Sequence, residues 1–593
     1  MIKLKNYNGE NPFSDSQARN FSDKKVTDEF YPISLFWTLF NDQHEILLGA
    51  RGSGKTFLLK MMRYSMLKKV EDERARKLVS EKKFLALYVP LHLEFVAPFN
   101  RACLTEEMRV DLFQICFNCF LAEAMITELK SIIDDFEDVK ERMQKQIELV
   151  SYLEEIWLGK QTNICRFEEL SDEIGKIYYR MDWSGTTVEH IPVVFKRQIC
   201  TPLIATRKKI SKLLNFNGEP TWIVCVDEAE FLNTTLQKCI NSVFRSDSNR
   251  IALKVATLPF YHTTLATLEK EVSISNGNDF CYRVVDMQYD SRDFIDLTNK
   301  LCAHRLDGRV GTKMKCQTVE DFVGVVGKDD FIDYYRLEVG DEQAEQTVIE
   351  EKIINSFSPQ RKKTAPNYSN KRKTIFDKYA PIFYLREMYN LSNMGNHRPG
   401  WYAGAKTIRK VSQGNPRLFI QLMSNLFDKA RETNLTPKKQ HEIIFEFAVD
   451  ICSATKALEI EGPLAYKYLD VIAEKLKKKT HGKYLATSGF SFTIKYKDET
   501  EFEKNKKWIE LAIAYSRIIV EEDVKKSGIK ADTIYMLSNA YAVTYWIPMR
   551  SDSPVKVSLD ESVENTYTVT AKKKKESDLQ YHQMSLFEEE PHD

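Results

Sequence analysis

The sequence predicts an α/β fold built around a parallel sheet, and three features predict it. Residues Gly49-Ala50-Arg51-Gly52-Ser53-Gly54-Lys55-Thr56 fit the pattern G-x-x-x-x-G-K-[ST] of a P-loop. A short apolar run, Glu45–Leu48, precedes the motif, and Phe57–Tyr64 follow it with apolar side chains at helical spacing. Further along, Thr221–Val226 is an apolar run of the kind that forms a parallel strand buried on both faces.

The residue types of the motif suit phosphate binding. Its glycines let the backbone turn tightly and approach phosphate oxygens with no Cβ in the way. Lys55 would reach the β- and γ-phosphates, and the Thr56 hydroxyl would bind Mg²⁺. The full pattern between a strand and a helix disfavours a chance glycine-rich turn. We therefore predict that a nucleotide is bound by Gly49, Ala50, Arg51, Gly52, Ser53, Gly54, Lys55 and Thr56.

Two carboxylates end the apolar run that begins at Thr221. Asp227 and Glu228 would lie at the carboxyl edge of the sheet, which faces the phosphate site in such folds. Asp227 would hold Mg²⁺, directly or through water, and Glu228 would polarise the attacking water. Three further runs are expected to complete the sheet: Phe84–Val89, Ile251–Thr257 and Arg283–Met287.

Composition limits the class of protein. Lys and Arg number 86 against 85 Asp and Glu, so any affinity for nucleic acid must come from local patches. The N-terminus is too polar for a signal peptide, and the most apolar run, 84–99, is interrupted by Pro90, His92 and Glu94. We therefore expect a soluble, cytoplasmic protein that does not enter a membrane. The C-x-x-C pair Cys116 and Cys119 is assigned to a helix core rather than to a metal.

The chain of 593 residues has room for three to four domains of about 150 residues each. Strand signals near the C-terminus are Ile518–Val520 and the alternation of Tyr541, Val543, Tyr545 and Ile547. The basic segment around 361–373 is either a solvated linker or a contact to DNA phosphates. The predicted organisation is a P-loop core at 1–290 with a helical insertion at 105–215, a helix-rich region at 291–458 with a basic loop at 358–375, a mixed domain at 459–560, and a disordered tail at 561–593.

Taken in order, the motifs resemble the AAA+ ATPases of the origin-recognition and initiator clade. The matching pieces are the P-loop, Asp227-Glu228, Thr257 as a sensor-1-like residue and Gly414-Asn415-Pro416-Arg417 as a sensor-2-like turn. STAND signalling ATPases carry a similar Gly-x-Pro element, so the motifs leave both groups open. The resemblance implies a P-loop NTPase of the ASCE/AAA+ type that hydrolyses ATP with Mg²⁺, and it makes 291–458 a helical lid and 459–560 a winged-helix-like domain.

The same resemblance implies roles for three further residues. Thr257 would monitor the γ-phosphate, and Arg417 would contact it from the lid. Such ATPases often complete the site with an arginine from a neighbouring subunit, which implies a homo-oligomer, and Arg283 is the candidate. The chain departs from the family pattern in its large insertion and in having Thr257 where asparagine is more usual.

The tail adds a separate motif. Residues Gln583, Ser585, Leu586 and Phe587 resemble the Q-x-[SD]-L-F peptide that docks onto the bacterial sliding clamp. Leu586 and Phe587 would fill an apolar pocket while Gln583 hydrogen-bonds at its rim, and a disordered tether would raise the local concentration of this anchor. The alternative is a chance apolar pair in a tail.

Two functions follow. The first is an ATP-driven switch that acts on DNA in replication and is recruited by the sliding clamp. The second is a sensor in a bacterial antiviral defence system, working with a separate effector protein, because no nuclease or protease motif is visible in the chain.

Overall fold

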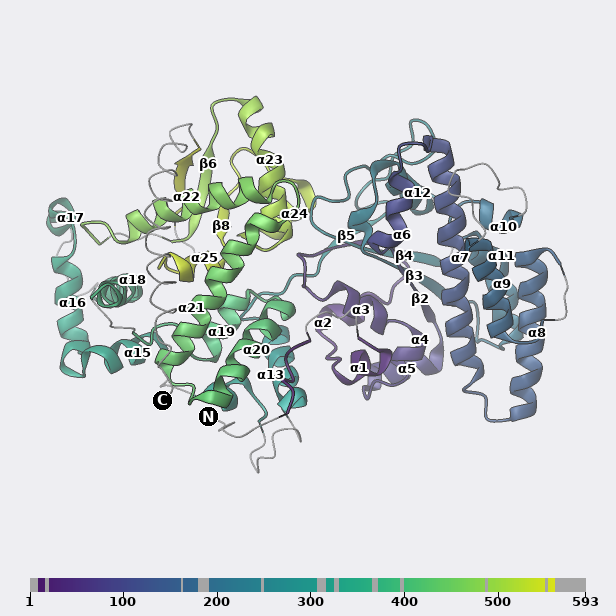
Figure 1. Cartoon of the computed structure of the whole chain (residues 1–593), viewed down its shortest axis with the longest axis horizontal. Coiled ribbons are helices and arrows are strands. Elements are labelled where there is room, and N and C mark those ends of the chain that lie inside the picture. Colours follow the sequence, from purple (N-terminus) through teal and green to yellow (C-terminus); the bar gives the residue numbers. More distant parts are fainter. Residues whose placement is uncertain are drawn as a thin grey trace, which may run out of the picture.

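The computed structural model describes residues 9–15, 21–160, 164–179, 191–246, 250–306, 316–324, 330–364, 372–394, 399–485, 489–549 and 553–559. These residues form two lobes side by side (Figure 1). One lobe holds the P-loop sheet and its helices, and the other holds the helix-rich region and the C-terminal strands.

The predicted parallel sheet is confirmed. Its strands run in the spatial order β2-β3-β4-β1-β5, and all neighbouring pairs are parallel. Every residue of β1, β3 and β4 is buried because these inner strands are covered on both faces, which explains their continuous apolar runs, whereas the residues of the edge strand β5 are only partly buried. The strand bounds are Glu45–Leu48 (β1), Phe84–Pro90 (β2), Thr221–Asp227 (β3), Ile251–Thr257 (β4) and Cys281–Val284 (β5), the last of which begins two residues earlier than predicted.

Helices cover the sheet and link its strands. The helix after the P-loop begins at Lys55 and packs against β3 and β4. A single 3₁₀ turn, Ala229–Phe231, follows β3. The helices of this part are Asp23–Asp28 (α1), Ser34–Thr38 (α2), Lys55–Met61 (α3), Tyr64–Leu67 (α4), Glu73–Glu81 (α5), Leu93–Val96 (α6) and Thr234–Phe244 (α12).

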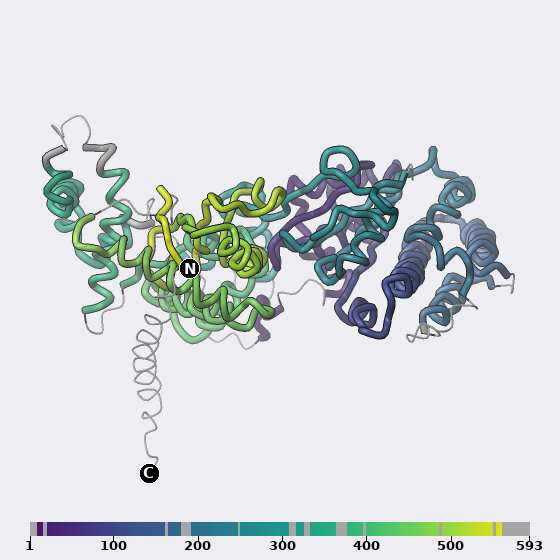
Figure 2. Tube along the Cα trace, turned by 90° about the horizontal axis from the view of Figure 1, so that it is seen from above, coloured from purple at the N-terminus to yellow at the C-terminus, as the bar shows by residue number. Residues whose placement is uncertain are grey.

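The region 105–215 is helical, and Figure 2 shows it at the outer end of the sheet lobe. Its longest helix, Glu106–Ile133 (α7), packs against β2 and separates it from Val139–Leu158 (α8), Phe167–Tyr179 (α9), Val193–Lys196 (α10) and Thr201–Leu213 (α11). By length and composition α7 could cross a membrane, but 67% of its most apolar window is buried inside the protein. Cys116 and Cys119 lie buried in this helix, and burial raises the pKa of both thiols.

The second lobe begins with the helices that the structure describes between Arg292 and Ala454. They are Arg292–Leu306 (α13), Val319–Val323 (α14), Asp330–Val339 (α15), Gln346–Asn355 (α16), Pro359–Thr364 (α17), Arg372–Ser392 (α18), Ala405–Ser412 (α19), Pro416–Glu432 (α20) and Pro437–Ala454 (α21). Helices α17 and α18 therefore occupy most of the stretch predicted as a basic loop. Arg361 packs its guanidinium over the rings of Phe357 and Tyr379, with 5.2 and 4.9 Å to the ring centroids.

The C-terminal part completes this lobe. Its elements are Gly462–Thr480 (α22), Ser491–Lys495 (β6), Glu499–Ala514 (α23), Ile518–Ile519 (β7), Glu522–Ser527 (α24), Tyr535–Leu537 (β8), Asn539–Thr544 (α25) and Val555–Ser558 (β9), and the strands form a sheet in the order β7-β8-β6-β9. One hydrophobic core runs without a break from α13 to β9, so the helical region and the C-terminal part are packed as one body.

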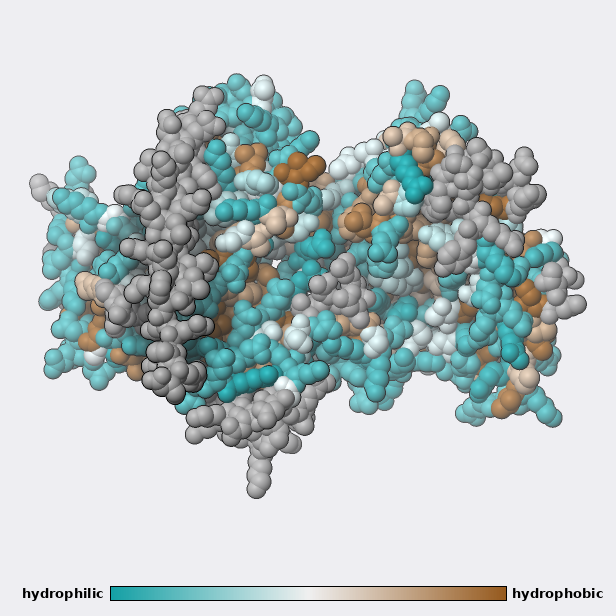
Figure 3. Space-filling model, viewed as in Figure 1, coloured by the Kyte–Doolittle hydropathy of each residue, from teal (hydrophilic) through white to brown (hydrophobic). Residues whose placement is uncertain are grey.

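The strand predicted at 541–547 is wrong. Residues Asn539–Thr544 form α25, and residues 539–543 are all buried. Tyr541, Val543, Tyr545 and Ile547 alternate with Ala542, Thr544 and Trp546, but all of these residues except Thr544 are buried, so the alternation does not mark a buried and an exposed face of a strand. The surface is otherwise ordinary: polar side chains cover most of the face in Figure 3, with apolar ones in small groups.

Candidate functional site

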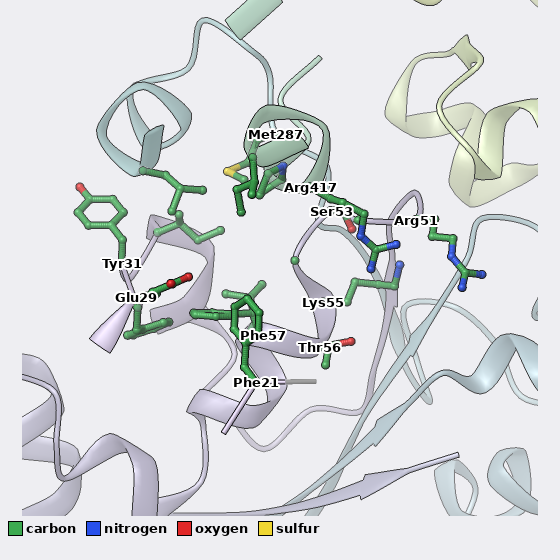
Figure 4. Close-up of a pocket in the computed structure, with 18 of the residues that line it drawn as sticks. Phe21, Glu29, Tyr31, Arg51, Ser53, Lys55, Thr56, Phe57, Met287 and Arg417 are labelled. Carbon is green, nitrogen blue, oxygen red and sulfur yellow. The ribbon is translucent and has the colours of Figure 1, made fainter. Parts of the chain in front are cut away.

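A cavity lies where the two lobes meet, and the predicted P-loop lines it. Figure 4 shows side chains from both lobes turned toward the same space. One end is polar, and the other end, between the N-terminal segment and helices α13 and α20, is apolar. The lining residues are Phe21, Glu29, Phe30, Tyr31, Ile33, Arg51, Gly52, Ser53, Gly54, Lys55, Thr56, Phe57, Leu58, Asp227, Glu228, Glu230, Leu258, Met287, Leu297, Leu301, Pro416, Arg417 and Ile420.

The P-loop lysine is held against its own loop. Lys55 Nζ donates hydrogen bonds to Gly49 O (2.6 Å) and Ala50 O (3.3 Å). Burial lowers the pKa of Lys55, and the carboxylate of Glu230 opposes this shift more strongly than those of Asp286 and Asp227 do. Gly54, with φ of 97°, caps α3 in a left-handed conformation that suits glycine. The loop therefore brings an ammonium group and the start of a helix to the polar end of the cavity, which is chemistry suited to a phosphate chain.

Asp227 is fixed by three hydrogen bonds. Its Oδ2 accepts from Tyr88 Oη at 2.8 Å, its Oδ1 accepts from Glu228 N at 2.9 Å, and the Thr56 hydroxyl also bonds to it. Burial raises the pKa of Asp227 despite these bonds. The hydroxyl of Thr56 and the carboxylate of Asp227 thus lie together beside the P-loop, and such oxygen ligands fit Mg²⁺.

Glu228 and Glu230 flank the same end of the cavity. Glu228 adopts φ of 59°, and its Oε2 lies 2.8 Å from His92 Nδ1, just beyond the end of β2. This hydrogen bond raises the pKa of His92 above its ordinary value. Glu230 is half-buried with its Oε2 shielded from solvent, and desolvation raises the pKa of its carboxyl. The predicted water-polarising group therefore has a partner, His92, within its own chain.

The turn between α19 and α20 rests directly on the P-loop. Asn415 caps α20 by accepting from Arg417 N and Leu418 N, and its Nδ2 donates to Arg51 O at 2.9 Å. A Cβ on Gly52, which has φ of 90°, would lie 2.7 Å from Asn415 Oδ1 and 2.8 Å from Arg417 Cβ. Arg417 lines the cavity above Lys55 (Figure 4). This contact brings the predicted sensor-2-like turn to the phosphate end.

The other two predicted assisting residues are placed differently. Thr257 ends β4 beside Leu48, and its buried hydroxyl has no hydrogen-bond partner among the described residues, but Leu258 rather than Thr257 lines the cavity. Arg283 on β5 reaches back to Glu45, the first residue of β1, with Nε 2.9 Å from Oε1. The Arg283 guanidinium therefore points toward the edge of the sheet opposite the P-loop.

The C-terminal part also contacts the P-loop. Arg51 N donates to Ala514 O, at the end of α23, at 2.9 Å. Asp286 accepts from Ala50 N (2.8 Å) and pairs with Lys525 Nζ (2.6 Å), which belongs to α24. Two consecutive residues of the P-loop are thus tied to elements about 230 and 460 positions later in the chain.

Sequence reasoning missed several residues of this site. Tyr88 and His92 gave no signal, because each depends on the register that places Pro90 beside Asp227. Glu230 follows Glu228 by two positions and could have been found as a third acidic group in the same turn. The tail residues Gln583, Ser585, Leu586 and Phe587 lie outside the described residues, so the clamp-binding motif stays a prediction.

A family model described as ORC-CDC6-like matches residues 11–557, which is most of the chain. No curated protein matches the chain. Because the family match spans both lobes and every element that lines the cavity, the protein belongs to the ORC-CDC6-like family and is an initiator-like AAA+ ATPase.

Proposed function

We propose that the protein is a Mg²⁺-dependent ATPase that switches between two arrangements of its lobes and acts on DNA. The observation that carries the proposal is the contact of Asn415 with Arg51 O, which sets the start of α20 on the P-loop. Phosphates bound by the loop would lie within the same cavity as Arg417. Binding and loss of the γ-phosphate would therefore bias how the α20 lid sits on the core.

The chemistry is assigned to the chain's own groups. Lys55 and the start of α3 would hold the β- and γ-phosphates, and Thr56 and Asp227 would hold Mg²⁺, which neutralises developing charge on the phosphates. Glu228 would polarise the attacking water once it leaves His92. Thr257 and Arg417 remain proposed γ-phosphate sensors. Arg283 would serve a neighbouring subunit in a homo-oligomer only after breaking its pair with Glu45.

DNA and the sliding clamp are the proposed partners. Membership of the ORC-CDC6-like family supports DNA as a partner, and the tail sequence supports the clamp. The defence-sensor alternative, with a separate effector, predicts instead that a phage-derived protein controls turnover.

One experiment tests the proposal: ATP hydrolysis by the full chain, measured alone, with double-stranded DNA, and with DNA plus a bacterial sliding clamp. We expect DNA to change the rate, and the clamp to act only through a tail with intact Leu586 and Phe587. A Leu586→Ala/Phe587→Ala chain is the matched control. Hydrolysis that responds to neither DNA nor clamp would contradict the proposed partners, and absence of nucleotide binding would contradict the proposed activity.

A further inference from the structure

Glu29 is the one charged side chain at the apolar end of the cavity among the residues that the structure describes. The other residues lining that end are hydrophobic or aromatic, whereas the remaining charged lining residues belong to the polar end. Glu29 ends α1, and its side chain is only 7% exposed. Figure 4 shows its carboxylate directed toward the space bounded by Phe57 and Met287. A buried carboxylate is costly unless it is paired, so its presence here requires an explanation.

Arg305 on α13 pairs with one of the two oxygens of the Glu29 carboxylate. Its Nη2 donates to Glu29 Oε2 at 2.6 Å, while its Nη1 donates to Pro12 O (3.2 Å) and Asp15 O (3.0 Å). The Arg305 side chain is 1% exposed, so it is fixed by its surroundings. Oε2 of Glu29 is therefore occupied, and the carboxylate is held in one orientation.

The second oxygen has no such partner within the described part of the chain. Among the described residues, no hydrogen bond to Glu29 Oε1 is present. Tyr31, which also lines this end of the cavity, directs its hydroxyl to Asp296 Oδ2 at 3.3 Å. The apolar end of the cavity thus offers a ligand a single, oriented, negatively charged hydrogen-bond acceptor.

We propose that Glu29 selects the nucleobase, by accepting a hydrogen bond from an exocyclic amine such as the 6-amino group of adenine. This inference rests on the proposed nucleotide function of the same cavity. A nucleotide whose phosphates lie on the P-loop places its base at the apolar end. A carboxylate oxygen only accepts, so it favours a 6-amino group over a 6-oxo group, whose lone pairs would face the charge. Two-oxygen recognition of guanine is disfavoured, because Arg305 already donates to Oε2 and holds it away from the base.

Three nucleotides that differ at position 6 of the purine test this assignment: ATP (amino), purine riboside 5′-triphosphate (hydrogen) and ITP (oxo). Equilibrium binding to the full chain is measured for each in Mg²⁺. We expect ATP to bind roughly 10-fold more tightly than purine riboside triphosphate, as for loss of one hydrogen bond to a charged group, and ITP to bind more weakly than either. Equal binding of ATP and purine riboside triphosphate, or ITP as tight as ATP, overturns the proposal.

The Glu29→Gln variant makes a sharper test, because it replaces the hydrogen-bond acceptor that faces the base with a donor. Arg305 Nη2 requires an oxygen, so it keeps the single amide oxygen and the NH₂ group faces the base. We expect the ratio of ATP affinity to ITP affinity to fall by about 10-fold or more relative to wild type. Glu269→Gln, an exposed change of the same kind, should leave the ratio unaltered. An unchanged ratio in Glu29→Gln overturns the proposal.

Separate measurements distinguish a folding defect of the Glu29→Gln variant from a loss of base selection. Thermal unfolding without nucleotide reports whether Glu29→Gln folds, and the wild-type ranking of the three nucleotides decides the matter if it does not. Equal binding of all three nucleotides would refute base selection by Glu29 and leave the proposed ATPase intact. Failure of all three to bind would remove both.

Discussion

Nδ1 of His92 lies 2.8 Å from Oε2 of Glu228, so a carboxylate proposed to act on water is held by an imidazole at the end of the adjacent strand. The pKa of His92 is raised above its ordinary value of 6.5, first by this hydrogen bond. A group with a raised pKa stabilises the fold fully below its unfolded pKa, and that contribution is lost as pH rises through the folded value. The contact between His92 and Glu228 therefore weakens as the pH rises through the pKa of His92, which lies above 6.5.

A His92→Gln variant tests this contact. We expect wild-type thermal stability to decline, relative to the variant, as pH rises from about 6 to 8.5, because only the histidine loses a charge-assisted bond. Melting temperatures of both proteins across that range give the difference. Parallel curves would show that the His92–Glu228 bond does not depend on protonation.

Loss of the P-loop ammonium should abolish nucleotide binding. Lys55→Ala removes the charge expected to hold the β- and γ-phosphates. At an ATP concentration 100 times its Kd, wild type should gain about 2.7 kcal/mol of stability, and the variant should gain none. Differential scanning fluorimetry with and without ATP measures the gain. Lys77→Ala, at an exposed lysine on α5, should behave as wild type.

Variants of Glu228 and Glu230 should affect ATP hydrolysis and ATP binding separately. If Glu228 polarises the attacking water, Glu228→Gln should bind ATP but hydrolyse it about 100-fold or more slowly. Single-turnover hydrolysis and a separate binding titration give the two quantities. Glu230→Gln, which removes the carboxylate that most favours the charged form of Lys55, should mainly change ATP affinity. Normal hydrolysis by Glu228→Gln would assign the water to another group.

Two glycines of the P-loop offer a matched pair. Both have positive φ, so alanine at either position costs about 1–3 kcal/mol in backbone strain. A Cβ on Gly54 meets nothing within 4 Å, whereas one on Gly52 meets Asn415 and Arg417. Gly52→Ala should therefore lower the free energy of unfolding more than Gly54→Ala does. Urea titrations without nucleotide measure both, and equal losses would mean that the α20 turn moves aside freely.

Lys525 should stabilise the contact between α24 and the P-loop. Lys525→Met leaves the Asp286 carboxylate, which is largely buried, without its ammonium partner. We expect a loss of about 1–3 kcal/mol in stability and a measurable change in ATP affinity, because Asp286 also accepts from Ala50 N. The charge-preserving Lys525→Arg variant should restore part of both. ATP affinity unaffected by Lys525→Met would confine the pair to a structural role.

The sheet and the phosphate end of the site could be predicted from sequence, because each depends on local patterns. Strands buried on both faces read as continuous apolar runs, and the P-loop and Asp227 are adjacent to them in the chain. Local patterns gave the wrong element at α25. Almost every residue there is buried, so no contrast between apolar and polar positions distinguishes a helix from a strand. Local patterns could not predict the positions of His92 and Glu29. His92 reaches Glu228 through the register of β2 on β3, and Glu29 is oriented by a contact with α13.

The hydrogen bond from Arg51 N to Ala514 O makes the P-loop a structural part of the boundary between the lobes. A molecule that binds the C-terminal part and displaces the end of α23 would disturb the backbone of the P-loop. If that loop binds nucleotide as proposed, thermodynamic reciprocity requires that nucleotide alters the affinity for that molecule by the same factor. The proposed communication between the lobes then needs no relay of intervening residues, because the backbone of the P-loop is itself the point of contact.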